Sequence, residues 1–314
     1  MSKHYLDAVH QGQNDWWRYI LSVVLILVGG LIFGGIATAM IAMVVVLATQ
    51  PALLSDATQV ESALMAFLSQ PTPFSFVLNN LPFLAIILGL VISTKFIHGR
   101  PFRSLISQSG QFSGTRFLTG FGVWFGILAL SLVISLVATP GDLVWNFDLR
   151  QWLPLLVVVL IFTPLQTAAE ELFCRGYLMQ ALGLLTRNRF LLMGVPSLLF
   201  ALGHFSNPEM ARGAVWMALS YWALGVFLAA ITLRDNRLEL ALGVHAAQNI
   251  FVLLLLNSKD SVLKTPSVWL LKETGDPMWG LVWLVLYAGL FYWIVFHGLS
   301  HWRKQTRSEQ NPEV

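Results

Sequence analysis

The stretch 168–182 reads AAEELFCRGYLMQAL and places Glu170, Glu171 and Arg175 inside an otherwise apolar run. The rest of the chain is equally apolar, because 56% of its 314 residues are hydrophobic and only 11% are charged. Soluble domains carry about 25% charged residues. The composition therefore predicts an integral membrane protein, in which three ionisable groups within six residues need a physical reason.

Apolar runs of the length needed to cross a bilayer, about 20 residues, recur along the chain. They predict an all-α, polytopic membrane protein with about eight transmembrane helices. The expected spans lie at about 19–48, 74–93, 117–138, 153–183, 190–205, 213–231, 238–256 and 278–298. Pro164 and Pro196 interrupt the fourth and fifth of these runs. The first contains Gly30 and Gly34, a spacing that permits close helix packing.

Lysine and arginine are distributed unevenly between the loops on the two sides of these spans. If the N-terminus is cytoplasmic, the inner segments hold thirteen of them and the outer loops hold five. Because cytoplasmic loops are enriched in these residues, both termini are expected in the cytoplasm. The net charge of +3 is therefore explained by topology, and no nucleic-acid partner is expected.

The charges of the fourth span divide into a pair and a single group. Three unpaired charges at the bilayer centre would cost roughly 8–10 kcal/mol on insertion scales. Glu171 and Arg175 are four residues apart, so they share a helix face and can form an ion pair that fixes packing. Glu170 is rotated by about 100° and has no local cation. A desolvated lone carboxylate favours its protonated form, which suits a general acid or base.

Two further polar groups lie on later spans, in FALGH (Phe200–His204) and HAAQN (His245–Asn249). Intramembrane polar residues usually face a bundle interior or a water-filled cavity. Two histidines, an amide and an unpaired carboxylate can together activate a water and stabilise an oxyanion. Counting along the helices places Glu170 and His204 at similar depth but His245 only about 10 Å from its inner end. Tilt, or a helix break near Gly243, would be needed to bring it level.

In these segments the chain resembles the CPBP family of CAAX-protease and bacteriocin-processing (Abi-type) membrane proteins, which includes the Ras-converting CAAX endopeptidase. The family pattern is EExxxR, then FxxxH, then HxxxN or HxxxD on successive polar helices. The matching segments here are Glu170–Arg175, Phe200–His204 and His245–Asn249, in the same order.

The resemblance implies an intramembrane endopeptidase that cleaves a peptide bond of a membrane-embedded peptide or protein. It implies that Glu170 and His204 activate the hydrolytic water and that His245 and Asn249 stabilise the oxyanion. The supporting residues it implies are Glu171, Arg175 and Phe200.

Metal dependence is left open by the residues. Glu170, His204 and His245 could serve as the three protein ligands of a catalytic zinc. The chain has no HExxH motif, and a glutamate–histidine pair can activate water without a metal, so the metal-free alternative is favoured.

The polar residues suggest three segments: N-terminal helices at 1–149, a catalytic core at 150–256, and a loop, last span and cytoplasmic tail at 257–314. A bacterial inner membrane is the expected location.

Two alternative functions remain. One is a proton-coupled transporter, since intramembrane Glu, His and Arg also form proton relays. The other is a non-catalytic scaffold or immunity protein. Cys174 lies between Glu171 and Arg175 and is a conceivable nucleophile, although buried cysteines are commonly inert.

Overall fold

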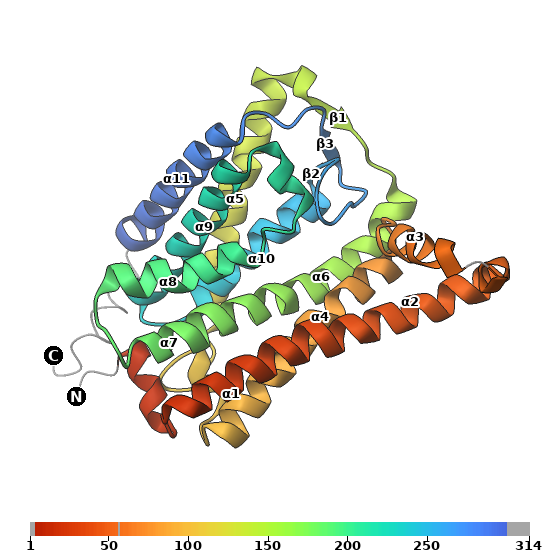
Figure 1. Ribbon diagram of the computed structural model, residues 1–314. Helices are drawn as coiled ribbons and strands as arrows, with labels where there is room; N and C mark the ends of the chain where they lie inside the picture. Colours follow the sequence, from red (N-terminus) through yellow and green to blue (C-terminus); the bar gives the residue numbers. More distant parts are fainter. Residues whose placement is uncertain (1–3, 56, 300–314) are drawn as a thin grey trace.

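The computed structural model describes residues 4–55 and 57–299, and this part of the chain is almost entirely helical, as predicted (Figure 1). The predicted cytoplasmic tail after residue 299 lies outside the described residues. The α-helices are α1 (Trp16–Leu27), α2 (Gly35–Thr49), α3 (Ala57–Leu68), α4 (Pro73–Ile92), α5 (Gly114–Ala138), α6 (Leu149–Glu171), α7 (Met179–Leu182), α8 (Arg189–Leu202), α9 (Ala214–Asp235), α10 (Glu239–Leu254) and α11 (Pro277–Trp293).

Several shorter elements join or extend these helices. The π-helical turns are η2 (Val28–Gly34), η4 (Ser93–Ile97), η7 (Leu172–Leu178) and η9 (Ile294–Gly298). The 3₁₀ turns are η1 (Tyr5–Gln11), η3 (Pro51–Ser55), η5 (Phe102–Leu105), η6 (Pro140–Asp142) and η8 (Pro208–Arg212). Three short strands, β1 (Leu143–Trp145), β2 (Leu256–Ser258) and β3 (Trp269–Leu271), form a small sheet in which β3 pairs antiparallel with β1 and parallel with β2.

Within the described residues, six helical segments are long and apolar enough to cross a membrane. They are Trp16–Thr49, Pro73–Ile97, Gly114–Ala138, Leu149–Leu182, Ala214–Asp235 and Pro277–Gly298, at the positions of six predicted spans. The remaining two predictions correspond to α8 and α10, which have 14 and 16 residues. At 1.5 Å per residue these helices are about 21 and 24 Å long, less than a hydrocarbon core of roughly 30 Å. The count of eight spans therefore stays a prediction.

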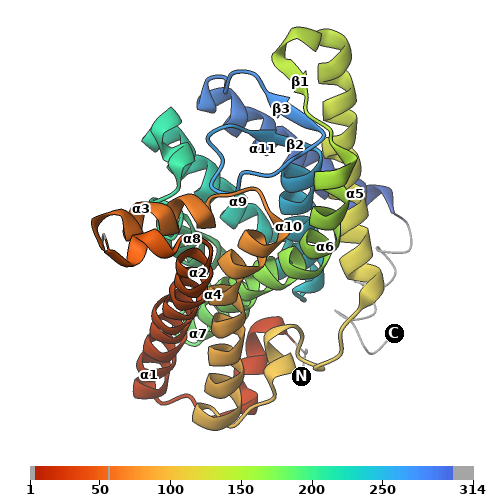
Figure 2. The same cartoon turned by 90° about the vertical axis from the view of Figure 1, so that its right-hand side faces the viewer.

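Helix α6 occupies the middle of the bundle, between α4 on one side and α10 on the other (Figures 1 and 2). Helix α10 in turn packs closely along α5, because glycines remove side chains at their contact. A Cβ on Gly120 would lie 2.4 Å from the Leu240 carbonyl, and one on Gly243 would lie 2.1 Å from the Phe117 carbonyl. Helix α10 continues unbroken through Gly243, so the break considered for that position is absent.

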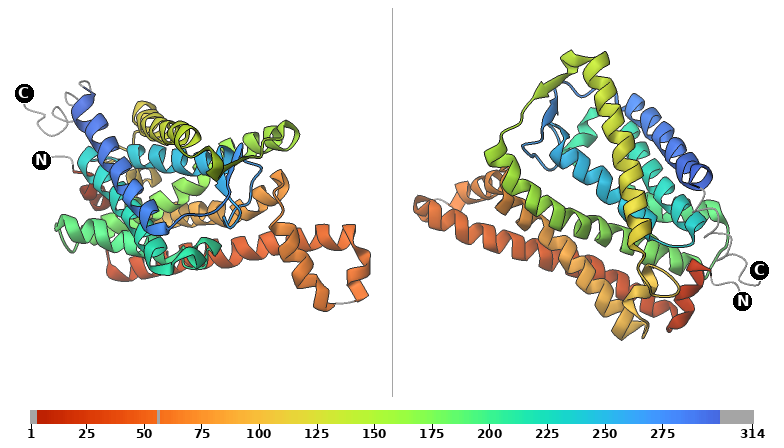
Figure 3. Two further views of the ribbon diagram at one scale, coloured as in Figure 1. Left: turned by 90° about the horizontal axis from the view of Figure 1, so that it is seen from above. Right: turned by 180° about the vertical axis from the view of Figure 1, so that it is seen from behind.

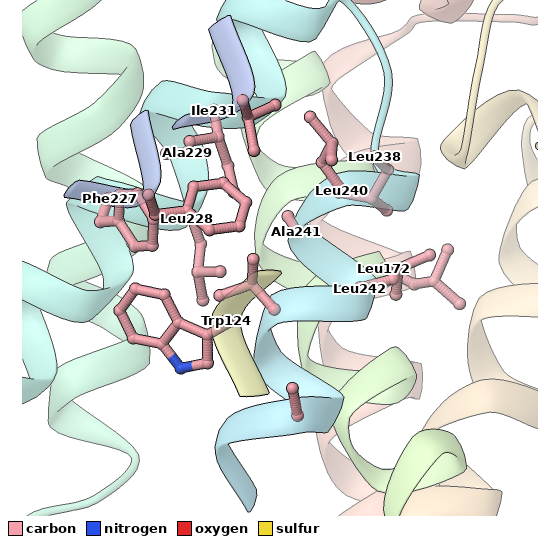
Figure 4. Packing of buried hydrophobic residues seen from close by; sticks show 14 of the residues in the cluster. Trp124, Leu172, Phe227, Leu228, Ala229, Ile231, Leu238, Leu240, Ala241 and Leu242 are labelled. Carbon is pink, nitrogen blue, oxygen red and sulfur yellow. The ribbon is translucent and has the colours of Figure 1, made fainter. Parts of the chain in front are cut away.

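The main apolar core lies where α5, α9 and α10 meet (Figure 4). Trp124 of α5 is fully buried and stacks on Phe227 of α9 at a centroid distance of 5.2 Å. Its indole N–H donates to Gln248 Oε1 of α10 at 2.9 Å. A buried indole needs such an acceptor, so Trp124 both fills the core and fixes α10 against α5.

The described ends of the chain meet at one end of the bundle (Figure 3). Tyr5 N–H donates to Asn236 Oδ1, and the Arg234 guanidinium lies over the Phe296 ring. The same end, called the basic end below, carries most of the positive charge of the described chain: Arg18, Lys95, Arg100, Arg103, Arg116, Arg187, Arg189, Arg234 and Arg237. Its assignment to the cytoplasm remains a prediction.

The N-terminal turn η1 packs into the basic end and holds the π-turn η7. Because η7 has π geometry, the Met179 N–H donates to the Cys174 carbonyl and not to that of Arg175. The Tyr5 hydroxyl lies 3.1 Å from the Arg175 carbonyl and 2.7 Å from the Leu105 carbonyl. Tyr5 is fully buried, so it supplies a donor at a place that water does not reach.

We expect Tyr5→Phe to destabilise the protein while leaving its packing intact. Loss of a donor to buried carbonyls costs about 1–3 kcal/mol. The measurement is the apparent melting temperature in detergent. Tyr292→Phe, at a half-buried ring that packs on Phe296, is the matched control. Equal melting temperatures for the Tyr5 variant and the wild type would contradict the role of this hydroxyl.

Candidate functional site

The two adjacent glutamates lie at the last two positions of α6, directly before the π-turn η7. Such turns inside α-helices occur frequently at functional sites. Glu171 is fully buried, whereas the Glu170 side chain retains 15% exposure. The end of the helix therefore directs one carboxylate into the protein and leaves the other partly open.

Glu171 is the centre of a buried polar network. Its Oε1 accepts a hydrogen bond from Arg175 Nη1 at 2.7 Å and another from His245 Nδ1 at 2.8 Å. Arg175 is fully buried and His245 is 2% exposed. The i,i+4 ion pair predicted from the sequence is thus present, and a third helix, α10, joins it through His245. One oxygen of this carboxylate compensates two donors that lipid could not satisfy, while Glu171 Oε2 has no donor within the described chain.

Glu170 is placed beside this network without being part of it. Its Oε2 lies 3.6 Å from His245 Nε2, beyond hydrogen-bond distance, and no donor in the described chain satisfies that oxygen. Since His245 donates from Nδ1 to Glu171, it can also donate from Nε2 only when both ring nitrogens carry a proton. Both glutamates keep an oxygen without a described donor, but only the Glu170 side chain is partly open, so Glu170 is the carboxylate with accessible bonding capacity.

The predicted depth mismatch of His245 does not occur, because α10 begins below the surface of the basic end. Glu239, its first residue, is fully buried, and the Leu238 N–H donates to the Ile106 carbonyl in the linker before α5. The count along the sequence assumed that all spans start at one plane. The deep start of α10 brings His245 level with Glu170 and Glu171 without a break in the helix.

His204 lies two residues beyond the end of α8 and reaches the network through Phe200. The Phe200 ring centroid is 4.5 Å from that of His204 and 5.8 Å from that of His245, and the Arg175 guanidinium lies 4.7 Å from the same ring. The Phe200 ring thus contacts three predicted site residues at once. His204 Nδ1 donates to the Phe200 carbonyl at 2.7 Å, which leaves Nε2 as the nitrogen available for proton transfer.

Asn249 is placed one turn after His245 on α10 and is half-buried. No side-chain hydrogen bond within the described chain ties it to the other site residues. The structure therefore joins Glu171, Arg175 and His245 directly, places Glu170 beside them, and brings in His204 through Phe200. The Asn249 amide lies on the same face of α10 as His245, one turn later, and is not engaged by the other described site residues.

The predicted zinc ligands do not form a metal site in this arrangement. Among the described residues, no three His, Cys, Asp or Glu side chains are placed to hold an ion together. The Nδ1 bonds of His245 to Glu171 and of His204 to a backbone carbonyl leave both Nε2 atoms free, so it is the separation of the groups that argues against a shared ion. Cys174, the alternative nucleophile, is 4% exposed.

The segment after His204 is clamped to the loop that follows β2. Arg212 donates to both oxygens of Asp260, each at 2.6 Å, and to the Ser258 hydroxyl. Glu209 accepts from the Val262 N–H at 2.8 Å. These contacts fix the segment that carries His204 at the end of the bundle opposite the basic end. The hydrogen bond from Arg212 lowers the pKa of Asp260, and Asp260 in turn raises the pKa of Arg212.

Two features of the site were not predicted from the sequence. The π-turn η7 has no sequence signature here. The second feature is Tyr221, which stacks on His204 at a centroid distance of 4.3 Å. The sequence could have indicated this residue only by its location inside the span Ala214–Asp235. Tyrosines of membrane proteins are enriched at the interfaces, so one away from the span ends indicates a polar neighbour.

Comparisons with known proteins point to one family. The family model described as type II CAAX prenyl endopeptidase Rce1-like matches residues 149–251, which include all three motifs. The uncharacterized protein YyaK of Bacillus subtilis (strain 168) is 32% identical over 303 residues, which cover 96% of each chain. No solved structure matches the chain.

We expect Arg175→Leu to destabilise the protein strongly, because it leaves Glu171 buried without its cation. Breaking a buried pair in this way costs about 3–5 kcal/mol, whereas replacing both partners by apolar residues is often neutral. Glu171→Leu/Arg175→Leu should therefore melt above the single variant. The exposed pair Arg187–Asp7 supplies the control, since Arg187→Leu should change stability by less than about 1 kcal/mol. A double variant that melts below Arg175→Leu would contradict this account.

We expect the Arg212–Asp260 clamp to weaken in acid. Because its pKa in the folded protein is lowered, Asp260 contributes stability above the ordinary carboxyl range and loses it as the pH falls through that lowered pKa. The melting temperatures of the wild type and Asp260→Asn should differ at neutral pH and converge as the pH falls through that lowered pKa. A difference that stays constant over this range would show that the charge of Asp260 contributes nothing.

Proposed function

The chain belongs to the Rce1-like family of CAAX-type intramembrane endopeptidases, and we propose that it hydrolyses a peptide bond of a membrane-associated substrate with a water activated by Glu170 and His204. The observation that carries this assignment is the difference between the two glutamates. Glu171 is fully buried and its Oε1 is held by Arg175 and His245, while Glu170 keeps an oxygen that no described donor satisfies on a side chain that is 15% exposed. A general base needs that free acceptor.

In this mechanism Glu170 accepts a proton from the water as the hydroxide adds to the substrate carbonyl carbon. The negative charge then develops on the carbonyl oxygen, where the His245 Nε2–H and the Asn249 amide donate. His204 donates through Nε2 to the leaving nitrogen as the C–N bond breaks, and it regains a proton from Glu170. Glu171 and Arg175 keep His245 oriented through Nδ1 throughout.

The geometry favours a glutamate-type mechanism over a metal centre. Within the described chain, Glu170, His204 and His245 do not converge as a three-ligand group. We further propose that the basic end faces the cytoplasm of a bacterial plasma membrane, supported by its concentration of arginines and lysines.

Cleavage of two matched probes tests this function. Purified protein in lipid nanodiscs is incubated with a farnesylated CAAX-type peptide and with the same peptide without its lipid, and products are identified by mass spectrometry. We expect Glu170→Gln and His204→Ala to lower the rate by about a hundred- to ten thousandfold. His245→Ala and Asn249→Ala should each cost about a hundred- to a thousandfold without loss of folding.

The exposed residues Glu61 and His10 supply matched controls, because Glu61→Gln and His10→Ala make the same chemical changes away from the site. Wild-type rates in Glu170→Gln would refute the assigned base, and loss of the rate after dialysis against a chelator would replace it with a metal centre. Proton-coupled uptake into liposomes without any cleavage would instead support the transporter alternative. Absence of both activities would leave the scaffold alternative standing.

A further inference from the structure

The position of His204 is not set by helix geometry. Helix α8 ends at Leu202, and His204 lies in the turns that lead to η8. Its backbone is held by the bond from its own N–H to the Ala201 carbonyl and by the bond that its carbonyl accepts from the Asn207 N–H. A side chain that must transfer a proton from such a segment needs contacts that fix its ring.

Helix α9 provides those contacts because it approaches α8 closely. A Cβ on Gly225 would lie 2.7 Å from the Ser197 Cβ and 3.0 Å from Arg175 Nη2, so only glycine allows this packing. One turn earlier on α9, the Tyr221 ring stacks on the His204 imidazole at 4.3 Å with an interplanar angle of 28°. The imidazole is thereby enclosed between Phe200 and Tyr221.

Tyr221 also holds the backbone that carries His204. Its hydroxyl accepts a hydrogen bond from Asn207 Nδ2 at 3.3 Å, and Asn207 is the residue whose N–H bonds to the His204 carbonyl. One side chain of α9 therefore contacts both the ring and the loop of His204.

We propose that Tyr221 is a positioning residue of this site, which holds the His204 ring against Phe200 so that Nε2 is presented for proton transfer. The electron-rich face of the tyrosine also stabilises the imidazolium that forms when His204 carries the proton. This inference rests on the proposed function. It assigns to Tyr221 an effect on the chemical step and none on substrate binding.

Two substitutions separate the ring from its hydroxyl. Tyr221→Phe keeps the stacking and loses the bond to Asn207, so we expect kcat within about threefold of the wild type. Tyr221→Leu loses the stacking, and we expect kcat to fall by about ten- to a hundredfold with KM unchanged. Trp222→Leu is the control for a general loss of aromatic packing, because Trp222 contacts α8 through the Gly194 carbonyl and is 40% exposed.

A double-variant comparison with His204→Ala distinguishes positioning from a structural role. If Tyr221 acts through His204, adding Tyr221→Leu to His204→Ala should not lower the remaining rate further. A further drop equal to that seen in the wild type, an effect on KM alone, or a normal kcat in Tyr221→Leu would each overturn the inference. The proposed function fails separately, if Glu170→Gln cleaves the same farnesylated peptide as fast as the wild type.

Discussion

A guanidinium buried away from water needs an anionic partner beside it, and this requirement organises the centre of the molecule. Arg175 is fully buried, and its partner Glu171 is fully buried as well. The pair is completed by His245 from α10 and covered by the Phe200 ring from α8. Because the ionisable groups could not face lipid at low cost, the segments that carry Glu171, Arg175 and His245 have to meet, and α8 covers them with an aromatic ring.

The parts of this arrangement that follow from helix periodicity were predictable from the sequence. The spacing of Glu171 and Arg175 indicated their ion pair, and the isolation of Glu170 indicated the free carboxylate. The features that depend on tertiary contacts were not predictable. The depth of His245 follows from the buried start of α10 under the linker at Ile106. The stacking of Tyr221 on His204 follows from the close approach of α9 at Gly225.

Residues outside the proposed core of 150–256 hold its geometry. Tyr5 supplies a donor to the carbonyl of Arg175, and Trp124 bonds to Gln248 one turn from His245. The segments before residue 150 therefore contribute directly to the geometry of the core. The division into three segments therefore remains a proposal about where the catalytic residues lie. The contacts that stabilise them come from residues along the whole chain.

The length of α8 has a consequence for the membrane around it. Helix α10 is buried, but α8 exposes apolar side chains such as Leu198 and Leu202, and with 14 residues it would as a span be in negative hydrophobic mismatch with a bilayer of ordinary thickness. Lipids next to such helices respond by thinning, which draws the headgroups toward the protein. The leaflet beside α8 would then form a local depression, through which water and an unwound polypeptide could reach His204 without crossing a full layer of acyl chains.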